Sequence, residues 1–179
     1  KGNLADFPFR VGPNGRSRGE FRIAGRIVDG RLNYAPDEFA PGTRKPAWPL
    51  IERIHGTIAF ERERMDIKAD SATSSGTALS NVKVAIPDLA AAHPLLTVDG
   101  EAAGPLQQFV RFTHDSPVGG WIDDFTRTTQ ASGNARLALK LQLPLDKMED
   151  ARVKGGLHFA GNTVRLLEDL PPLSAAAGV

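Results

Sequence analysis

The feature that most constrains this chain is a strict alternation of apolar and polar residues over positions 134–143. Apolar residues recur at every second position there, and they are Ala135, Leu137, Leu139, Leu141 and Leu143. A period of two places all of them on one face of an extended strand, because successive side chains point to opposite sides. At about 3.3 Å per residue such a strand runs ~30 Å, longer than most strands. The segment predicts a long strand with one apolar face.

The same alternation, in weaker form, fills most of the remaining chain. It is visible at positions 21–27, 54–60, 65–69, 82–86, 96–102 and 153–159. Asp29-Gly30 and Gly161-Asn162 are dipeptides typical of hairpin turns, and we expect them to join neighbouring strands. About nine strands linked by turns indicate a mostly β chain, folded as an antiparallel meander of long twisted strands.

A stretch near residues 105–127 breaks the period of two. Apolar residues recur there with helical spacing, which predicts two short amphipathic helices separated by Ser116-Pro117. Residues 35–49 hold four prolines and predict a long loop. We expect the apolar helical positions to pack on the sheet as a lid, and these positions are Leu106, Phe109, Val110, Val118, Trp121, Ile122 and Phe125.

Two short helices are too few to cover the apolar face of such a sheet. Either the sheet folds on itself as a closed β-sandwich, or it stays open as a groove with apolar walls. An open groove needs a ligand or a neighbouring module against its apolar face. Periodicity alone favours the closed form.

No group of residues has the spacing of a catalytic or metal site. The absence of Cys excludes disulfides, thiolate metal ligands and a cysteine nucleophile, and the four histidines are scattered. The balance of 22 basic against 21 acidic residues disfavours nucleic acid as a partner. We expect no enzymatic activity, no cofactor and no metal. The enzymatic alternative is a β-sandwich glycosidase that uses carboxylates such as Glu61 or Asp66.

Short sequence words occur in a fixed order along the chain. They are Leu4-Ala5-Asp6-Phe7-Pro8-Phe9, Tyr34-Ala35-Pro36, Trp48-Pro49, Ile86-Pro87-Asp88-Leu89, Gly100-Glu101-Ala102-Ala103-Gly104-Pro105, Ser116-Pro117-Val118, Gly133-Asn134-Ala135-Arg136, Leu143-Pro144-Leu145 and Phe159-Ala160-Gly161-Asn162. This series resembles the central part of YhdP-like proteins, the large AsmA-like relatives of TamB in the Gram-negative envelope. The resemblance covers nearly the whole chain, with residues 37–47 as an insertion.

The resemblance implies a non-enzymatic segment of a bridge-like lipid transfer protein that serves outer membrane biogenesis. Its relatives look like inner-membrane-anchored proteins whose periplasmic part is an open apolar β-groove. That groove would conduct phospholipid acyl chains between the inner and outer membranes. The alternative is a structural or protein-binding β-sandwich module of the cell envelope.

A faint repeat, in which residues 170–178 resemble residues 4–12, indicates a domain plan, and the alternating pattern gives a set of groove residues. Residues 1–169 form one β-rich module of a longer chain, residues 170–179 begin the next module, and flanking modules of the same chain are expected partners. The groove candidates are Ile54, Ile58, Phe60, Ile67, Val82, Val84, Leu96, Val98, Leu137, Leu139, Leu141, Leu157 and Phe159.

Overall fold

The computed structural model describes residues 2–4, 22–121, 126–147, 150–166 and 171–178, with the backbone alone described for residues 2–4 and Trp121. The described chain forms ten strands and two helices. The strands are β1 (Gly2–Leu4), β2 (Arg22–Leu32), β3 (Ile51–Glu61), β4 (Arg64–Ser74), β5 (Thr77–Ile86), β6 (Leu95–Pro105), β7 (Gln130–Ser132), β8 (Asn134–Pro144), β9 (Arg152–Arg165) and β10 (Leu173–Gly178). The helices are α1 (Leu106–His114) and α2 (Val118–Trp121).

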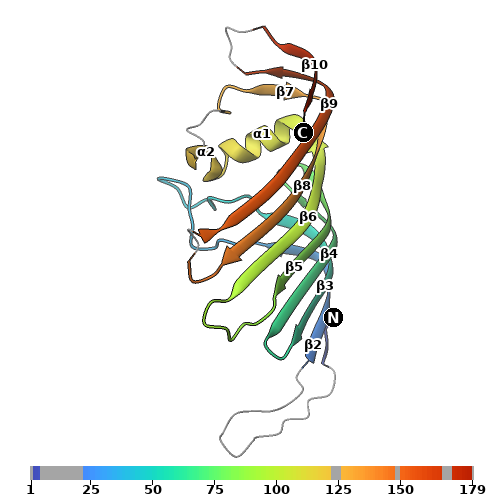
Figure 1. Cartoon of the computed structure of the whole chain (residues 1–179), viewed down its shortest axis with the longest axis vertical. Coiled ribbons are helices and arrows are strands. Elements are labelled where there is room, and N and C mark those ends of the chain that lie inside the picture. Colours follow the sequence, from blue (N-terminus) through green and yellow to red (C-terminus); the bar gives the residue numbers. More distant parts are fainter. Residues whose placement is uncertain (1, 5–21, 122–125, 148–149, 167–170, 179) are drawn as a thin grey trace, which may run out of the picture.

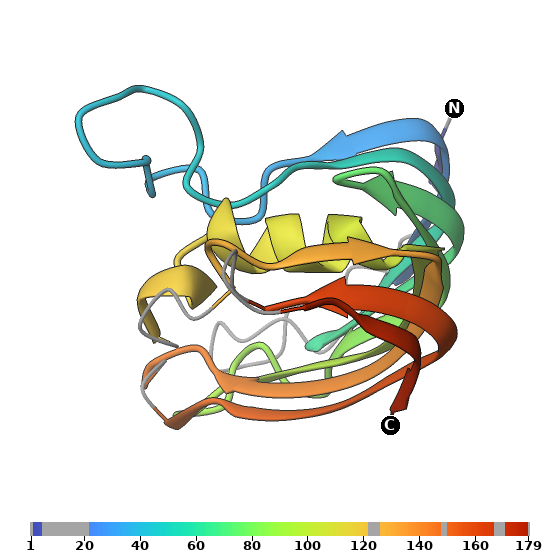
Figure 2. The ribbon, with the colours of Figure 1, turned by 90° about the horizontal axis from the view of Figure 1, so that it is seen from above.

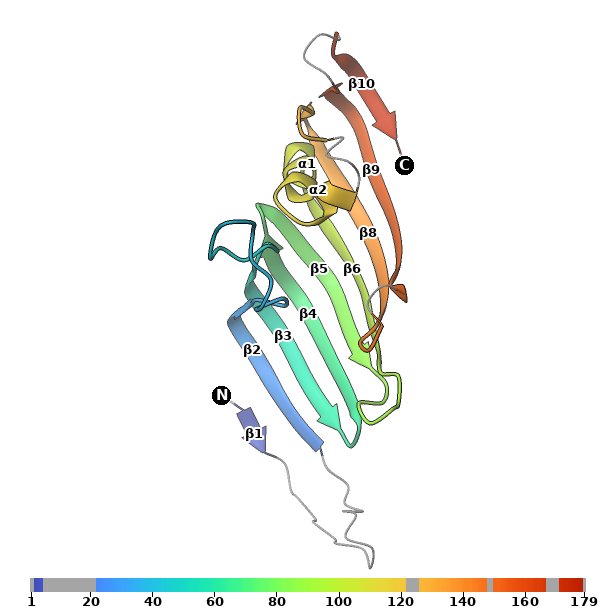
Figure 3. The ribbon, with the colours of Figure 1, turned by 90° about the vertical axis from the view of Figure 1, so that its left-hand side faces the viewer.

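All ten strands belong to one antiparallel sheet (Figure 3). Consecutive strands are neighbours from β1 to β6, the sheet continues through β8, β9 and β10, and β7 pairs with β9 beside this path. All strands of the described chain pair within this one sheet, so none belongs to a second layer. The predicted open meander is confirmed, and its closed-sandwich alternative is wrong.

Two tight turns explain why long strands stay in register. Arg62 and Glu63 join β3 to β4, and Ser75 and Gly76 join β4 to β5. The backbone φ angles of Ser75 and Gly76 are +47° and +78°. Two positive φ angles are typical of the type I′ turn, whose twist matches that of the flanking strands.

The prediction of hairpin turns at Asp29-Gly30 and Gly161-Asn162 is wrong. Both dipeptides lie inside strands, β2 and β9. Asp29 has a φ of +52° and sits where the β2–β3 register shifts, so it forms a β-bulge in place of a turn. A residue with a left-handed backbone conformation fits both a hairpin turn and a β-bulge, and only the pairing of the strands shows which of the two it forms.

Bulges recur on neighbouring strands and curve the sheet. Arg53 in β3 and Asn81 in β5 also have positive φ, at +52° and +54°, and each lies at a register shift. Bulges strengthen the local right-handed twist and bend the strand. Seen from above, the sheet curves into a trough (Figure 2).

The two helices lie on the concave side of this trough (Figure 2). In the sequence they come after β6, and in space they lie near one end of β5, β6 and β8 (Figure 3). The strands of the sheet run obliquely to the long axis of the molecule (Figure 1). The structure thus has helix where the sequence predicts a helical insert. Neither helix of the described chain is long and apolar enough to cross a membrane.

Asn162 fixes the corner where β7, β8 and β9 meet. Its side chain is fully buried, and its Nδ2 donates hydrogen bonds to the carbonyl oxygens of Ser132 (2.8 Å) and Asn134 (3.2 Å). Gly133, at a φ of +86°, turns the chain between β7 and β8 directly over this amide. A Cβ at Gly133 would lie 2.6 Å from the Asn162 nitrogen, so the corner requires glycine.

Both ends of the described chain lie at sheet edges. β1 pairs with β2, and β10 pairs with β9. The last strand, which falls within residues 170–179, therefore continues the sheet formed by the preceding ones. The division of the chain into two modules stays a prediction.

Candidate functional site: an open apolar groove

The groove candidates named from the sequence share one face of the sheet. Directly paired residues in antiparallel strands point to the same side, so the register assigns the face. One row of paired residues crosses seven strands without interruption; we call it the wide row, and it consists of Gly25, Ile58, Ile67, Val84, Val98, Leu141 and Val153. With strands about 4.8 Å apart, six intervals give a track of ~29 Å.

The other candidates occupy parallel rows on the same face. Phe60 pairs with Met65, Leu96 with Leu143, Leu137 with both Ala102 and Leu157, and Phe159 with Ala135. Ile54 and Val82 contact one hydrophobic cluster with Ala69 and Ala72. We call the whole surface the apolar face.

Burial shows that the apolar face is open. Leu137, Leu139 and Leu141 are half-buried, whereas Arg136, Ala138 and Lys140 between them are exposed. Curvature brings side chains together on the concave side and spreads them on the convex side, so the half-buried set lines the concave side. The described residues that are fully buried and apolar are few and mostly small: Ile54, Ala69, Ala72, Ile86, Ala102, Leu106 and Ala135.

Small residues form a low central track along the floor. Leu139 pairs with Gly100 on one side and with Gly155 on the other, and Gly56 pairs with Ala69. A Cβ at Gly56 would lie 2.0 Å from the Lys68 carbonyl oxygen, so glycine permits this close approach of β3 and β4. Gly100 is also tightly packed, since a Cβ there would lie 3.1 Å from Val82 Cγ2.

Helix α1 covers one end of the apolar face. Leu106 is only 4% exposed, and its backbone N–H donates to the Gly133 carbonyl (2.9 Å). Gln107 Oε1 accepts a hydrogen bond from the Ala131 backbone (2.6 Å) and so ties the helix to β7. Gln108 lies over the β4–β5 turn, 3.1 Å from where a Gly76 Cβ would stand. These contacts hold the helix in place at the end of the trough.

The residues predicted as a lid divide into two groups. Leu106 is buried, and Phe109, Val110 and Val118 are half-buried in the helical segment. The side chain of Trp121, together with Ile122 and Phe125, lies outside the described residues. A lid function for this set stays a prediction.

An aromatic cluster, which the sequence did not lead us to expect, joins the long loop to α1. The Trp48 ring lies between Tyr34, at 6.0 Å, and Phe112 of α1, at 6.5 Å between centroids. Trp48 Nε1 donates a hydrogen bond to the Glu38 carboxylate (2.7 Å). Burial of the phenol, with Glu38 nearby, raises the pKa of Tyr34 to about 12. Aromatic residues are concentrated near Pro36 and Pro49 in the sequence, and this is the signal from which the cluster could have been predicted.

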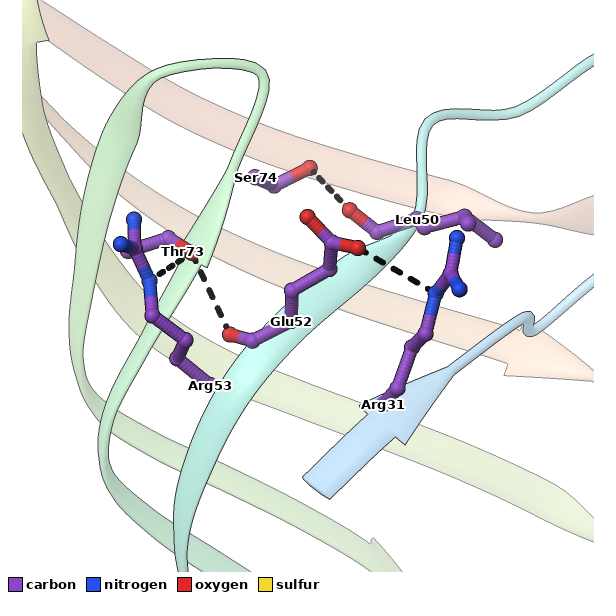
Figure 4. Close-up of polar contacts among 6 residues, drawn as sticks. All are labelled: Arg31, Leu50, Glu52, Arg53, Thr73 and Ser74. Atoms are coloured by element: carbon purple, nitrogen blue, oxygen red, sulfur yellow. Dashed lines mark hydrogen bonds and ion pairs between the residues drawn. The ribbon is translucent and has the colours of Figure 1, made fainter. Parts of the chain in front are cut away.

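Side chains replace the interrupted ladder where β3 is bulged (Figure 4). Arg53 Nε donates to Thr73 Oγ1 (3.2 Å), and that hydroxyl donates to the carbonyl oxygen of Glu52 (3.3 Å). Ser74 Oγ donates to the Leu50 carbonyl (3.0 Å). Arg31 forms an exposed ion pair with Glu52 at 3.2 Å, so three strands are joined at this rim of the trough.

The titratable groups with shifted pKa values lie away from the apolar face. Arg64 donates two hydrogen bonds to the Asp66 carboxylate, at 2.5 and 2.7 Å, and lowers the pKa of Asp66. A hydrogen bond from His93 lowers the pKa of Asp146 and connects the β5–β6 and β8–β9 loops. Within the described residues no cluster of three His, Cys, Asp or Glu side chains could hold a metal ion. The first pair therefore lies within β4, and the second is an exposed link between two loops.

Comparison with protein families finds a match, described as "YhdP protein", over residues 1–179. The comparisons with curated proteins and with solved structures find no significant match. The match spans every strand and helix described above.

Proposed function

Since the chain belongs to the YhdP protein family, we propose that it is a segment of a bridge-like lipid transfer protein. In this proposal the apolar face conducts phospholipid acyl chains through the periplasm, between the inner and outer membranes. No covalent step is involved, so the segment is not an enzyme. The chain is part of an envelope protein anchored in the inner membrane, and flanking modules of that chain continue its groove.

The observation that carries the proposal is the wide row, whose members from Gly25 to Leu141 are half-buried and whose last member, Val153, is exposed. Its large aliphatic side chains, such as Ile67, Val98 and Leu141, line the concave side of an open sheet. A contiguous apolar surface of this kind marks a site that a ligand or a partner covers. Its length of ~29 Å is close to the ~30 Å thickness of a bilayer's hydrocarbon core.

The physical chemistry of transfer follows from this geometry. Each methylene group that leaves water for the groove contributes roughly 0.8 kcal/mol, and charged headgroups stay in water at the mouth of the trough. From β3 to β9 the wide row offers a similar aliphatic side chain on each strand that it crosses, so an acyl chain moves from one position to the next without a deep minimum. This favours sliding over tight binding.

Adjacent positions on β8 provide a matched test. Leu139 lies on the apolar face and Lys140 on the opposite one. A photo-crosslinking amino acid at position 139 should form lipid adducts in cells, and the same amino acid at position 140 should not. Measuring the thermal stability of Leu139→Asp beside this experiment shows whether position 139 faces ligand or packed protein.

Each outcome bears on the proposal. Lipid adducts at 139, with Leu139→Asp folded but blocked in lipid passage, support conduction. Unfolding of Leu139→Asp without any lipid adduct at 139 contradicts it. Adducts to protein in place of lipid would favour the alternative, a structural or protein-binding module of the envelope.

A further inference from the structure

The convex face carries a row of cations that lipid conduction does not use. Register places Arg26, Thr57, Lys68, Lys83, Asp99, Lys140 and Lys154 side by side across seven strands. All seven side chains are exposed, and they alternate along each strand with residues of the apolar face. We call the five cations of this row the basic belt.

The basic belt concentrates charge in a chain that is otherwise balanced. The formal net charge of the whole chain is +1, yet the belt holds five cations against one carboxylate, Asp99. Lys140 pairs with Asp99 at 3.2 Å. Among the described residues, no ion pair engages Arg26, Lys83 or Lys154.

Two like-charged pairs within the belt oppose folding. Lys68 lies directly opposite Lys83, and Lys140 lies directly opposite Lys154. Like charges at directly paired positions destabilise a sheet. The ion pair with Asp99 compensates at Lys140, whereas no ion pair between described residues engages Lys68 or Lys83. A local arrangement that opposes folding without an evident compensating contact is characteristic of functional sites.

A hollow on the same face lies beside the belt. It has a volume of 380 Å³, and its lining includes the small residues Ala138 and Gly156, which are paired, together with Lys140, Lys154, Asp99 and Glu101. The two carboxylates offset the two ammonium groups in this hollow. The uncompensated charge of the basic belt therefore comes mainly from Arg26, Lys68 and Lys83.

We propose that the basic belt docks an extended acidic segment of a partner protein on the convex face. The belt is continuous across the sheet, with cations on five of seven strands over ~29 Å, which about nine extended residues span at ~3.3 Å each. A flat anionic membrane would touch a convex surface along only part of this length, whereas a flexible peptide follows the curve. Charge complementarity of this kind determines partner choice and speeds association.

Fluorescence anisotropy of the 179-residue chain tests the proposal directly. The probe is a fluorescein-labelled peptide of about twelve residues in which Glu alternates with Ser, and the control replaces Glu by Gln. The Glu peptide should bind, and Lys68→Gln/Lys83→Gln should weaken it about tenfold. The matched variant Lys45→Gln/Lys147→Gln removes two exposed loop lysines and should leave binding unchanged.

The possible results distinguish docking of an acidic peptide from a structural effect and from membrane binding. The Lys68/Lys83 variant relieves a like-charge pair, so its melting temperature should stay the same or rise, and lost binding then reports lost docking. Equal weakening by both variants, or no binding of the Glu peptide at low salt, overturns the proposal. Belt-dependent binding of phosphatidylglycerol vesicles without peptide binding overturns it in favour of a membrane. Lipid crosslinking at position 139 should be unchanged in the Lys68/Lys83 variant, because the two faces act independently.

Discussion

The two ends of the apolar face differ in side-chain size and in cover. At the helix end, where α1 lies on the sheet, the buried residues are small: Ala72, Thr77, Ala102 and Ala135. At the open end, the wide row presents large aliphatic side chains that are half-buried from β3 to β8, and Val153 in β9 is exposed. In the described structure α1 and α2 lie near one end of the sheet, and neither helix lies over its other end (Figure 3).

The difference shows how one alternating pattern produces two environments. Small residues let a helix approach the sheet closely, and the helix then supplies the apolar contact through Leu106. Large residues without a helix leave apolar surface in contact with water, which opposes solubility unless something else covers it. Packing stabilises the first end, and the second end is available for a ligand.

The largest expected effect compares a charge at each end. Ala135→Asp buries an unpaired carboxylate beneath α1 and should lower the free energy of unfolding by about 4 kcal/mol. Leu139→Asp leaves the carboxylate partly in water and should cost about 2 kcal/mol or less. Urea titration of both variants measures the two losses in the free energy of unfolding. Equal losses would mean that the open end is as tightly packed as the helix end.

Alanine substitutions at two glycines in the floor of the groove should differ in their effect on stability. Gly56→Ala forces a Cβ to within 2.0 Å of the Lys68 carbonyl and should destabilise the chain by about 3 kcal/mol. Gly25→Ala places its Cβ at an ordinary 3.5 Å from Ile58 Cγ2 and should change stability by less than about 1 kcal/mol. Thermal melts of the two variants suffice, and a milder effect at Gly56 would show that β3 and β4 separate easily.

The attachment of the helix can be weakened alone. Gln107→Ala leaves the Ala131 N–H without its partner and should cost about 1–2 kcal/mol. Gln142→Ala, on the exposed side of β8, is the control and should cost almost nothing. Hydrogen exchange should quicken at Ala131 in the first variant. Unchanged exchange there would mean that contacts other than Gln107 position α1.

The smallest expected effect is a pH dependence at the loops of the open end. The pKa of Asp146 is lowered by His93, so the folded chain favours the carboxylate. The stabilisation is present above the ordinary Asp pKa of about 3.9 and is lost as the pH falls through the lower folded value. Asp146→Asn should therefore lower the melting temperature slightly at pH 6 and leave it unchanged at strongly acidic pH. A difference that persists in acid would exclude this cause.

Sequence reasoning succeeded where the signal was periodic. Alternation at Leu137, Leu139 and Leu141 predicted both the length of β8 and its apolar face, because pleating converts a period of two directly into sidedness. Helical spacing likewise predicted α1. In the weaker strands the sequence left the inward parity open, because bulges such as those at Arg53 and Asn81 shift the alternation and only the pairing register shows which residues share a face.

Sequence reasoning failed where one local backbone conformation is compatible with both a turn and a β-bulge. Asp29-Gly30 and Gly161-Asn162 adopt the left-handed backbone that their composition favours, but long-range pairing makes them bulges. The contacts of Trp48, Gln107 and Asn162 also depend on segments distant in sequence. Periodicity carries no information about such partners.

The meander has a consequence for the order in which the chain folds. From β3 to β5 each strand pairs with one that lies only a tight turn away, so these hairpins close early. The pairing of β6 with β8 closes a loop of residues 106–133, which includes α1. Closing a long loop loses more chain entropy than closing a tight turn, so we expect this pairing to form later. We expect pulse-labelled hydrogen exchange during refolding to protect β4 before β8. Earlier or simultaneous protection of β8 would mean that the helical insert forms first and nucleates the sheet around itself.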